Sequence, residues 1–463
     1  MKLTRKELLV GGAAGAALGA AGIYELVDRL GDSSPSEAAS ATQAPEQHLV
    51  NGLRVERKEG VEVVVPLRHH EVVTAKVVAP QNELLAAQAD LAAVLAELDA
   101  AYPTTPEALA LSVAWGLPYF RAHVPKAADA HLPFDRRAQK PALIDAIRFP
   151  SDPEDTNLEA NDVAFLFRSD NEENIRTAAT EIADRMKGAL AVTSIRKGFA
   201  GQMDGGKGLP KEMATAAGVP GADLIPDGAE LFLGFTSTQR NALGPAKIVN
   251  FETLGLVDLG PRSYFHGGTH MHLSHIFEDL EAWYLNQDFR DRVNTTFRPH
   301  MLVRPGTQTV AQPPSRVASE REVSRDYSRY GMIGHSSSLQ PASRLQQDIH
   351  GDDGTLYPKG TAIPQRADFN TLDNPFFWSA DPKGDRMGDG PAAGLHFVVF
   401  NPTSDDFHRN RLAMDGVMPG GQKLKFPPRA PGQGFNSILK TTHRQNFLVP
   451  PRRHRAFPLA EIS

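Results

Sequence analysis

The chain has no cysteine among its 463 residues. Disulfides, thiolate catalysis, cysteine-ligated zinc, iron–sulfur clusters and thiolate-bound haem are therefore excluded. Any metal or cofactor has to be held by histidine, carboxylate, methionine, tyrosine or backbone groups.

Positive charge is not in excess either. There are 49 Lys and Arg residues against 55 Asp and Glu residues, which gives a formal net charge of −6. A nucleic-acid binder needs basic residues to neutralise phosphates, so we expect no nucleic-acid partner. The hydrophobic share of 41% and the charged share of 22% are those of an ordinary globular protein. The length predicts two or three domain-sized units, or one large two-lobed domain.

The N-terminus has a weak apolar run instead of a long hydrophobic one. Residues 8–24 are uncharged but rich in Gly and Ala, and they are too short and too weakly apolar for a typical spanning helix. The preceding run 4–9 resembles a twin-arginine export signal, with Lys6 in place of the second arginine. We therefore expect residues 1–48 to be an export signal and linker, and the protein to be periplasmic, extracellular or associated with the cell envelope. An ordinary secretory signal and an uncleaved anchor are the alternatives, and only an uncleaved signal would bring the protein to a membrane.

The periodicity of the first half predicts alternating strands and helices. Strands are expected at 61–65, 71–78, 108–115, 162–167 and 190–195, and helices at 81–101 and 171–186. The resulting order from 71 onward is strand, helix, strand, strand, helix, strand. This is the split βαβ, ferredoxin-like arrangement.

The second half is predicted to contain a shorter version of the same order of strands and helices. Strands are expected at 270–276 and 395–401, and helices at 277–286 and 404–414. Long irregular stretches lie between them, at 304–325, 351–364 and 381–393, and such loops are uncommon unless they cover a site. The prediction is an α+β protein with two ferredoxin-like halves, 49–230 and 231–463, of the dimeric α+β barrel type, with long loops around a pocket in the C-terminal half.

Six segments of the second half resemble, in order, those of one enzyme family. They are 234–241 (Gly-Phe-Thr-Ser-Thr-Gln-Arg-Asn), 267–272 with Trp283 after it, Gly334-His335 with Pro341 after it, 363–366 (Ile-Pro-Gln-Arg), 394–398 and 447–451. Each is similar to a segment of the dye-decolorising peroxidases, which are haem enzymes built from two ferredoxin-like halves. The chain thus resembles a divergent, exported member of that superfamily.

The resemblance implies a cofactor, a reaction and two site residues. It implies heme b, and one-electron oxidation of a small organic reductant by hydrogen peroxide. His335 matches the proximal iron ligand, and a neutral imidazole can donate a ring nitrogen to iron. Arg366 matches a distal arginine, whose guanidinium can stabilise negative charge that develops on peroxide. The fold of this family often forms homo-oligomers, and the sequence leaves the number of subunits open.

Ser237 is the main departure from the family pattern. The family has an aspartate at this position, which moves a proton between the peroxide oxygens, and a serine hydroxyl is a poor general base. We therefore expect weak turnover, or another acid such as Asp368 or Asp373 in its place. A haem-binding or carrier protein without turnover is an alternative function.

Three histidines of one expected strand could have a different role from that of His335. His270 and His272 point to one face because side chains alternate along a strand, and His275 has the opposite parity. These histidines could be satisfied by neighbours and water, could contact the haem propionates, or could form a zinc or copper site with a third ligand in a haemless binding protein.

Overall fold

The computed structural model describes residues 23–27, 44–58, 61–135, 138–201, 208–235, 262–303, 317–350 and 356–463. Ser237 and most of the expected export signal lie outside these residues. In the described part, no helix combines the length and the apolar character that a membrane crossing requires.

The first half has the predicted element order. It contains β3 (His69–Val77), α3 (Leu84–Ala101), β4 (Ala110–Gly116), β8 (Val163–Ser169), α6 (Glu172–Arg185) and β9 (Leu190–Phe199). The strands lie side by side in the antiparallel order β9-β3-β8-β4, as in a ferredoxin-like unit. Asn171 begins α6 because its side chain accepts a hydrogen bond from the backbone N–H of Glu173.

The second half repeats this arrangement. It contains β10 (Thr269–Glu278), α9 (Leu280–Leu285), β14 (Phe369–Thr371), β16 (Gly394–Asn401), α13 (Ser404–Met414) and β17 (Leu439–Val449). The strand order is β17-β10-β16-β14, again antiparallel. The expected helix at 277–286 begins only at Leu280, because β10 continues to Glu278.

The two halves join into one barrel. Asn370 of β14 pairs with Phe199 of β9, and Phe447 of β17 pairs with Gly116 of β4. Since β10 pairs with both β16 and β17, the strand pairings return to their starting point. The interior holds apolar side chains from both halves. The architecture is therefore the predicted α+β fold of two ferredoxin-like halves.

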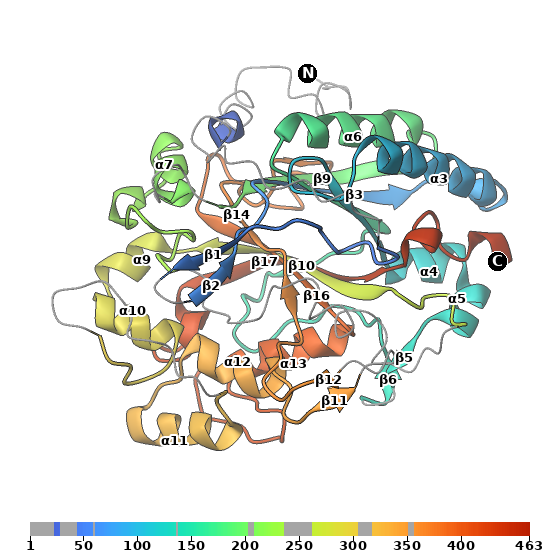
Figure 1. Ribbon diagram of the computed structural model, residues 1–463. Helices are drawn as coiled ribbons and strands as arrows, with labels where there is room; N and C mark the ends of the chain where they lie inside the picture. The colour runs from blue at the N-terminus through green and yellow to red at the C-terminus, as the bar shows by residue number, and fades with distance from the viewer. Residues whose placement is uncertain are drawn as a thin grey trace.

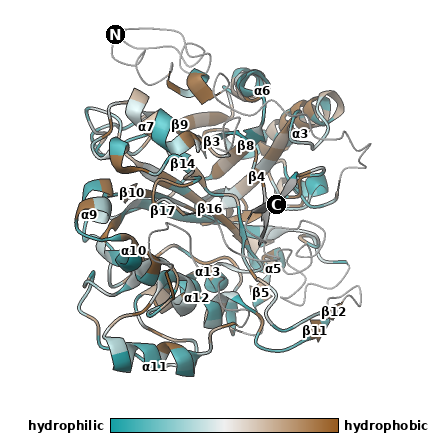
Figure 2. Ribbon diagram, turned by 60° about the vertical axis from the view of Figure 1, so that its left-hand side comes forward, coloured by the Kyte–Doolittle hydropathy of each residue, from teal (hydrophilic) through white to brown (hydrophobic). Residues whose placement is uncertain are grey.

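Helices cover the strands on opposite sides (Figure 1). Helices α3 and α6 pack together over the first half, and α12 (His335–Ser343) packs on α13 beside the second half. Figure 2 shows the same layers from another side, with α11 (Glu320–Tyr330) at the lower edge of the molecule. The prediction of irregular structure up to residue 325 is wrong from Glu320 onward, because Ser319 and Glu322 form a capping box that starts α11.

Smaller elements connect these layers. The strands are β1 (Val55–Lys58), β2 (Val61–Val64), β5 (Phe134–Asp135), β6 (Lys140–Pro141), β7 (Asn157–Leu158), β11 (Ile349–His350), β12 (Leu356–Tyr357), β13 (Gln365–Arg366) and β15 (Trp378–Ser379), and the helices are α4 (Leu117–His123), α5 (Pro125–His131), α7 (Leu209–Ala216) and α10 (Phe289–Thr296).

A short piece of the expected export signal packs into the core. Tyr24 is 3% exposed and Val27 is fully buried. Both belong to an apolar cluster that also contains Phe199, Leu209 and Trp283. Residues 23–27 therefore contact the folded domain directly.

Candidate functional site

A cavity of about 970 Å³ lies in the second half of the protein. Side chains from β10, β13, β16, α12 and α13 line it, together with residues of the long connecting segments. Its lining includes both His335 and Arg366, which are thirty-one positions apart in the sequence. The predicted pocket of the C-terminal half is thus present, and the two leading candidates share it.

A close backbone approach sets the position of His335 at the start of α12. A Cβ atom on Gly334 would lie 2.3 Å from the carbonyl oxygen of Phe297, so the residue before the histidine has to be glycine. The N–H of Ser337 donates to that same oxygen at 3.0 Å, which fastens the first turn of the helix. The histidine side chain is held at one wall of the cavity as a result.

The His335 ring is neutral and partly exposed to the cavity. It stacks on Phe435 with a centroid distance of 4.4 Å and an interplanar angle of 30°. Burial, reinforced by the positive charges of Arg366 and Arg411, lowers its pKa from 6.5 to about 3. Its Nδ1 atom is buried, with no hydrogen-bond partner among the described residues. The imidazole therefore keeps nitrogen lone-pair character at every physiological pH.

Arg366 faces the same cavity from β13. It pairs with Val399 of β16, and residues directly opposite each other in an antiparallel pair point to the same face. Both Arg366 and Val399 line the cavity. The Arg366 Nε atom lies 3.9 Å from the Asp368 carboxylate, which also lines the cavity.

Basic side chains outnumber acidic ones around the cavity. The described lining contains six basic residues (Arg298, Arg344, Lys359, Arg366, Arg411 and Arg444) and three acidic ones (Asp152, Glu278 and Asp368). Arg411 and Arg444 share one buried carboxylate, since their guanidinium groups lie 3.2 and 2.8 Å from Asp152 Oδ1. The cavity is therefore suited to a ligand that carries negative charge.

The histidines of β10 lie apart from this lining. His270 Nδ1 is 2.8 Å from the Pro402 carbonyl oxygen. His272 is on the cavity side of the sheet, but its ring stacks on Phe407 at 3.4 Å and 14°, and Phe407 is the residue that lines the cavity. Both His272 nitrogens have protein partners, Asn446 at 2.7 Å and Ser274 at 2.5 Å. Protein groups therefore satisfy His272 below the cavity wall.

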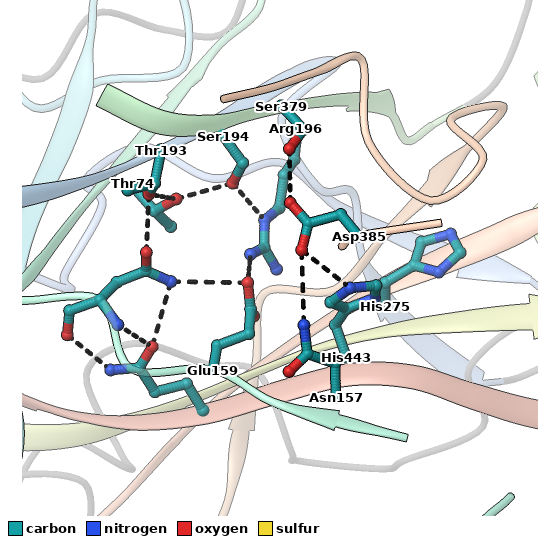
Figure 3. A network of polar contacts seen from close by, with 12 residues as sticks. Thr74, Asn157, Glu159, Thr193, Ser194, Arg196, His275, Ser379, Asp385 and His443 are labelled. Carbon is teal, nitrogen blue, oxygen red and sulfur yellow. Dashed lines mark hydrogen bonds and ion pairs between the residues drawn. The ribbon is translucent and has the colours of Figure 1, made fainter. Parts of the chain in front are cut away.

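His275 points the other way, into the barrel, as its parity predicts. Its ring lies 5.2 Å from that of His396, and its Nδ1 is 2.7 Å from Thr442 Oγ1. Figure 3 shows this polar interior, in which Arg196 pairs with Glu159 at 2.5 Å and His443 lies 3.3 Å from Asp385. The candidate residues predicted from the sequence thus separate into His335 and Arg366, which line the cavity, and the three histidines of β10, which do not.

Within the described ranges, no group of three or more His, Cys, Asp or Glu side chains is arranged to hold a metal ion. The alternative of zinc or copper on His270 and His272 has no third ligand there. The position of Ser237 is outside the described residues, and Phe235, two residues before it, lines the cavity.

Sequence reasoning did not single out Glu278, Arg411 and Arg444, which also line the cavity. The sequence contains no signal for Glu278, because it lies in the expected helix 277–286 and strand parity applies to it only once β10 is seen to continue to residue 278. No sequence pattern links Arg411 and Arg444 to Asp152, since these residues come from three distant segments.

The residues of the cavity fit a haem. His335 supplies a neutral imidazole with a buried, unpartnered Nδ1, and the surplus of basic side chains suits the two propionates. Apolar side chains, among them Leu233, Phe235 and Ile276, complete the walls. His335 differs in one respect from most iron-bound histidines. Their second ring nitrogen usually donates to an acceptor, whereas His335 Nδ1 has no partner among the described residues.

Comparison with known proteins gives a family and a fold. The model of a family of unknown function, DUF7405, matches residues 67–451. No protein of curated function matches the sequence. Among solved structures, a DyP-type peroxidase from Cellulomonas bogoriensis is similar with a TM-score of 0.51 and 16% identity, over 88% of this chain and 96% of that one. An arginine-to-leucine variant of Rhodococcus jostii DypB in complex with heme has a TM-score of 0.50 and 12% identity, over 84% and 95% of the two chains. At these identities the likeness shows the fold alone, which is that of DyP-type peroxidases.

Proposed function

We propose that this chain, which belongs to the DUF7405 family, is a haem-dependent, peroxidase-like protein that oxidises a small organic donor with hydrogen peroxide. The observation that carries the proposal is the arrangement of His335 and Arg366 in one cavity of about 970 Å³. The DyP-type fold and a structural neighbour in complex with heme support it.

His335 is the residue that would hold the iron. Its low pKa, about 3, keeps the ring unprotonated, so that a nitrogen lone pair stays available. The stack on Phe435 fixes the plane of the ring. Arg298, Arg344, Arg411 and Arg444 are the basic lining residues from which partners for the propionates would come.

Arg366 supplies a fixed positive charge to the cavity. A bound haem supplies the redox-active iron for one-electron chemistry with peroxide. A guanidinium that faces the reacting oxygens stabilises the negative charge that develops on them, because a group already in place needs no reorganisation. The carboxylate of Asp368, 3.9 Å from Arg366, helps to orient that guanidinium.

Ser237 in place of an aspartate favours slow turnover, and it motivates a second candidate function. A haem-binding or carrier protein would use the same His335 ligand and would not need a proton-transfer group. The two candidates separate on one measurement, since only the first oxidises a dye when peroxide is added.

We also propose that the protein is exported, by a twin-arginine-like signal in residues 1–48. The support is the basic start followed by a weakly apolar, Gly- and Ala-rich run. That route carries folded proteins, which suits a chain that binds a cofactor before export.

The test is haem binding followed by turnover. The purified chain is titrated with haem, and its absorption spectrum and its peroxide-dependent oxidation of a dye are recorded, with His350→Ala, an exposed histidine, as the matched control for His335→Ala. We expect a Soret band and slow dye oxidation in the wild type and in His350→Ala, and the loss of that band in His335→Ala. The absence of a Soret band in the wild type would reject the proposal, and a Soret band without dye oxidation would favour the carrier function.

A further inference from the structure

One acidic side chain of the cavity has no assigned role. Glu278 is the last residue of β10, and its backbone N–H donates to the Ala393 carbonyl oxygen at 3.0 Å. Ser274, Ile276 and Glu278 alternate along the strand and all line the cavity. The carboxyl group therefore faces the space that also contains Arg366 and His335.

The Glu278 carboxyl is buried and incompletely satisfied. The residue is 5% exposed, and its Oε2 atom has no hydrogen-bond partner in the part of the chain that the structure describes. A charged carboxylate in such a place carries a large desolvation cost. Burial, together with the negative charge of Asp368, raises its pKa from 4.5 to about 8. At neutral pH the group is therefore a protonated acid.

The groups around Glu278 leave its proton available to a ligand. Asp368 is the nearby acid that acts on it electrostatically, and that carboxylate lies 3.9 Å from Arg366. Among the described residues, Tyr284 of α9 also interacts electrostatically with Glu278, and its hydroxyl already donates to the Phe232 carbonyl oxygen at 2.6 Å. Since no group among the described residues bonds the Glu278 Oε2 atom, a ligand in the cavity can be its partner.

We propose that Glu278 is the acid–base group that exchanges a proton with hydrogen peroxide in this cavity, in place of the carboxylate missing at Ser237. The inference rests on the proposed function. In the overall reaction one peroxide and two donor molecules AH give two waters and two donor radicals, so that each donor loses one electron and one proton. Glu278 donates its proton to one peroxide oxygen and takes up the proton of the other, so that it is unchanged at the end. Groups with a pKa near the working pH are the most effective in this role.

The experiment compares Glu278→Gln with Glu281→Gln, which removes an exposed carboxylate three residues further on. Haem-loaded proteins are assayed for peroxide-dependent dye oxidation between pH 5 and pH 9. We expect Glu278→Gln to lose about 100-fold or more of the rate at neutral pH, a typical loss for an acid–base group, with an unchanged Soret band. We expect Glu281→Gln to match the wild type.

A second readout needs neither haem nor turnover. Because the folded pKa of Glu278 is higher than the unfolded one, the unfolded chain releases this proton first as the pH rises, and stability falls between about pH 4.5 and pH 8. The melting temperature of haem-free Glu278→Gln should equal that of the wild type at the acidic end of this window and exceed it by a few degrees at the basic end. At pH 7 the infrared absorption of protonated carboxyl groups should be weaker in Glu278→Gln than in the wild type, because one such group is removed.

The outcomes separate the two claims. A wild type that binds no haem overturns the proposed function and this inference together. A haem-loaded Glu278→Gln with the wild-type rate, or equal melting curves at both ends of the pH window, overturns the role of Glu278 and leaves the haem proposal standing. A large loss in Asp368→Asn with none in Glu278→Gln also overturns it, and assigns the role to Asp368.

Discussion

The hydroxyl of Tyr24 donates a hydrogen bond of 2.8 Å to Asp373 Oδ1, across 349 positions of the sequence. The same hydroxyl accepts from the backbone N–H of Leu372 at 3.1 Å, and the second oxygen of Asp373 accepts from the N–H of Lys197 at 2.7 Å. Lys197 lies on β9 of the first half, whereas Asp373 follows β14 of the second half. Tyr24 therefore binds where the two halves meet.

Tyr24→Phe should lower the stability of the protein. It leaves the ring in place and removes a buried hydroxyl, so that one oxygen of a buried carboxyl loses its donor. We expect a loss of roughly 1–3 kcal/mol in the free energy of unfolding, measured in urea. Tyr102→Phe, at a partly buried tyrosine elsewhere, is the control. A variant as stable as the wild type would show that the Tyr24 hydroxyl contributes nothing to the stability of the domain.

The processing of the N-terminus follows from the same contact. Removal of the whole expected export signal and linker, residues 1–48, would take Tyr24 and Val27 out of the core. We expect the folded protein, after export in a host cell, to begin before Tyr24, and peptide mass spectrometry of the N-terminus measures this directly. A folded, exported protein that begins after residue 27 would contradict the expectation.

Asp373 should give the protein a pH-dependent stability. Burial raises its pKa from 3.8 to about 7. The unfolded chain therefore loses this proton at lower pH than the folded one, and the free energy of unfolding falls as the pH rises from about 4 to about 7, by at most roughly 4 kcal/mol. Asp373→Asn cannot ionise and should lack this slope, even though it also loses an acceptor. Parallel curves for the two proteins would contradict the prediction.

Arg366→Leu should slow the reaction and spare the cofactor. The variant removes the positive charge that faces the cavity but leaves His335 intact. We expect peroxide-dependent dye oxidation to fall about 100- to 1000-fold, the usual effect of removing one such electrostatic group. Arg321→Leu, at an exposed position on α11, should keep the wild-type rate. A Soret band that vanishes in Arg366→Leu would instead place this arginine among the groups that hold the haem.

His272→Phe separates a packing role from a cofactor role. The new ring can keep the stack on Phe407 but loses the bonds to Asn446 and Ser274. We expect a loss of about 1–3 kcal/mol of stability, because two buried polar partners lose their bonds, and a haem spectrum identical to that of the wild type. A shifted Soret band in His272→Phe would restore this histidine as a cofactor contact.

The sequence predicts the local parts of this fold well. The spacing of Leu91, Val94, Leu95 and Leu98 gives α3 its buried face, and Asn171 marks the start of α6. The strand pairing that closes the barrel could not be predicted, because Asn370 and Phe199 meet across 171 positions and no local sequence pattern indicates their contact. The sequence prediction lacks helix α11, although Ser319 and Glu322 form a recognisable capping box.

The cavity residues also differ in how far the sequence predicts them. His335 and Arg366 could be selected through the family resemblance, which carries tertiary information in its motif order. Glu278 could not, because a glutamate at a strand end normally lies in solvent, and only the packed structure shows its burial. The burial of His272 beneath Phe407 likewise depends on where α13 lies against β10, which strand parity alone does not fix.

The most direct test of the account is whether His335 is the iron ligand. The measurement is the absorption spectrum of haem-loaded His335→Gly with and without added imidazole, beside that of the wild type. The account predicts that the variant loses the wild-type Soret band and that imidazole restores it by entering the vacated space. A His335→Gly spectrum identical to that of the wild type without imidazole would contradict it.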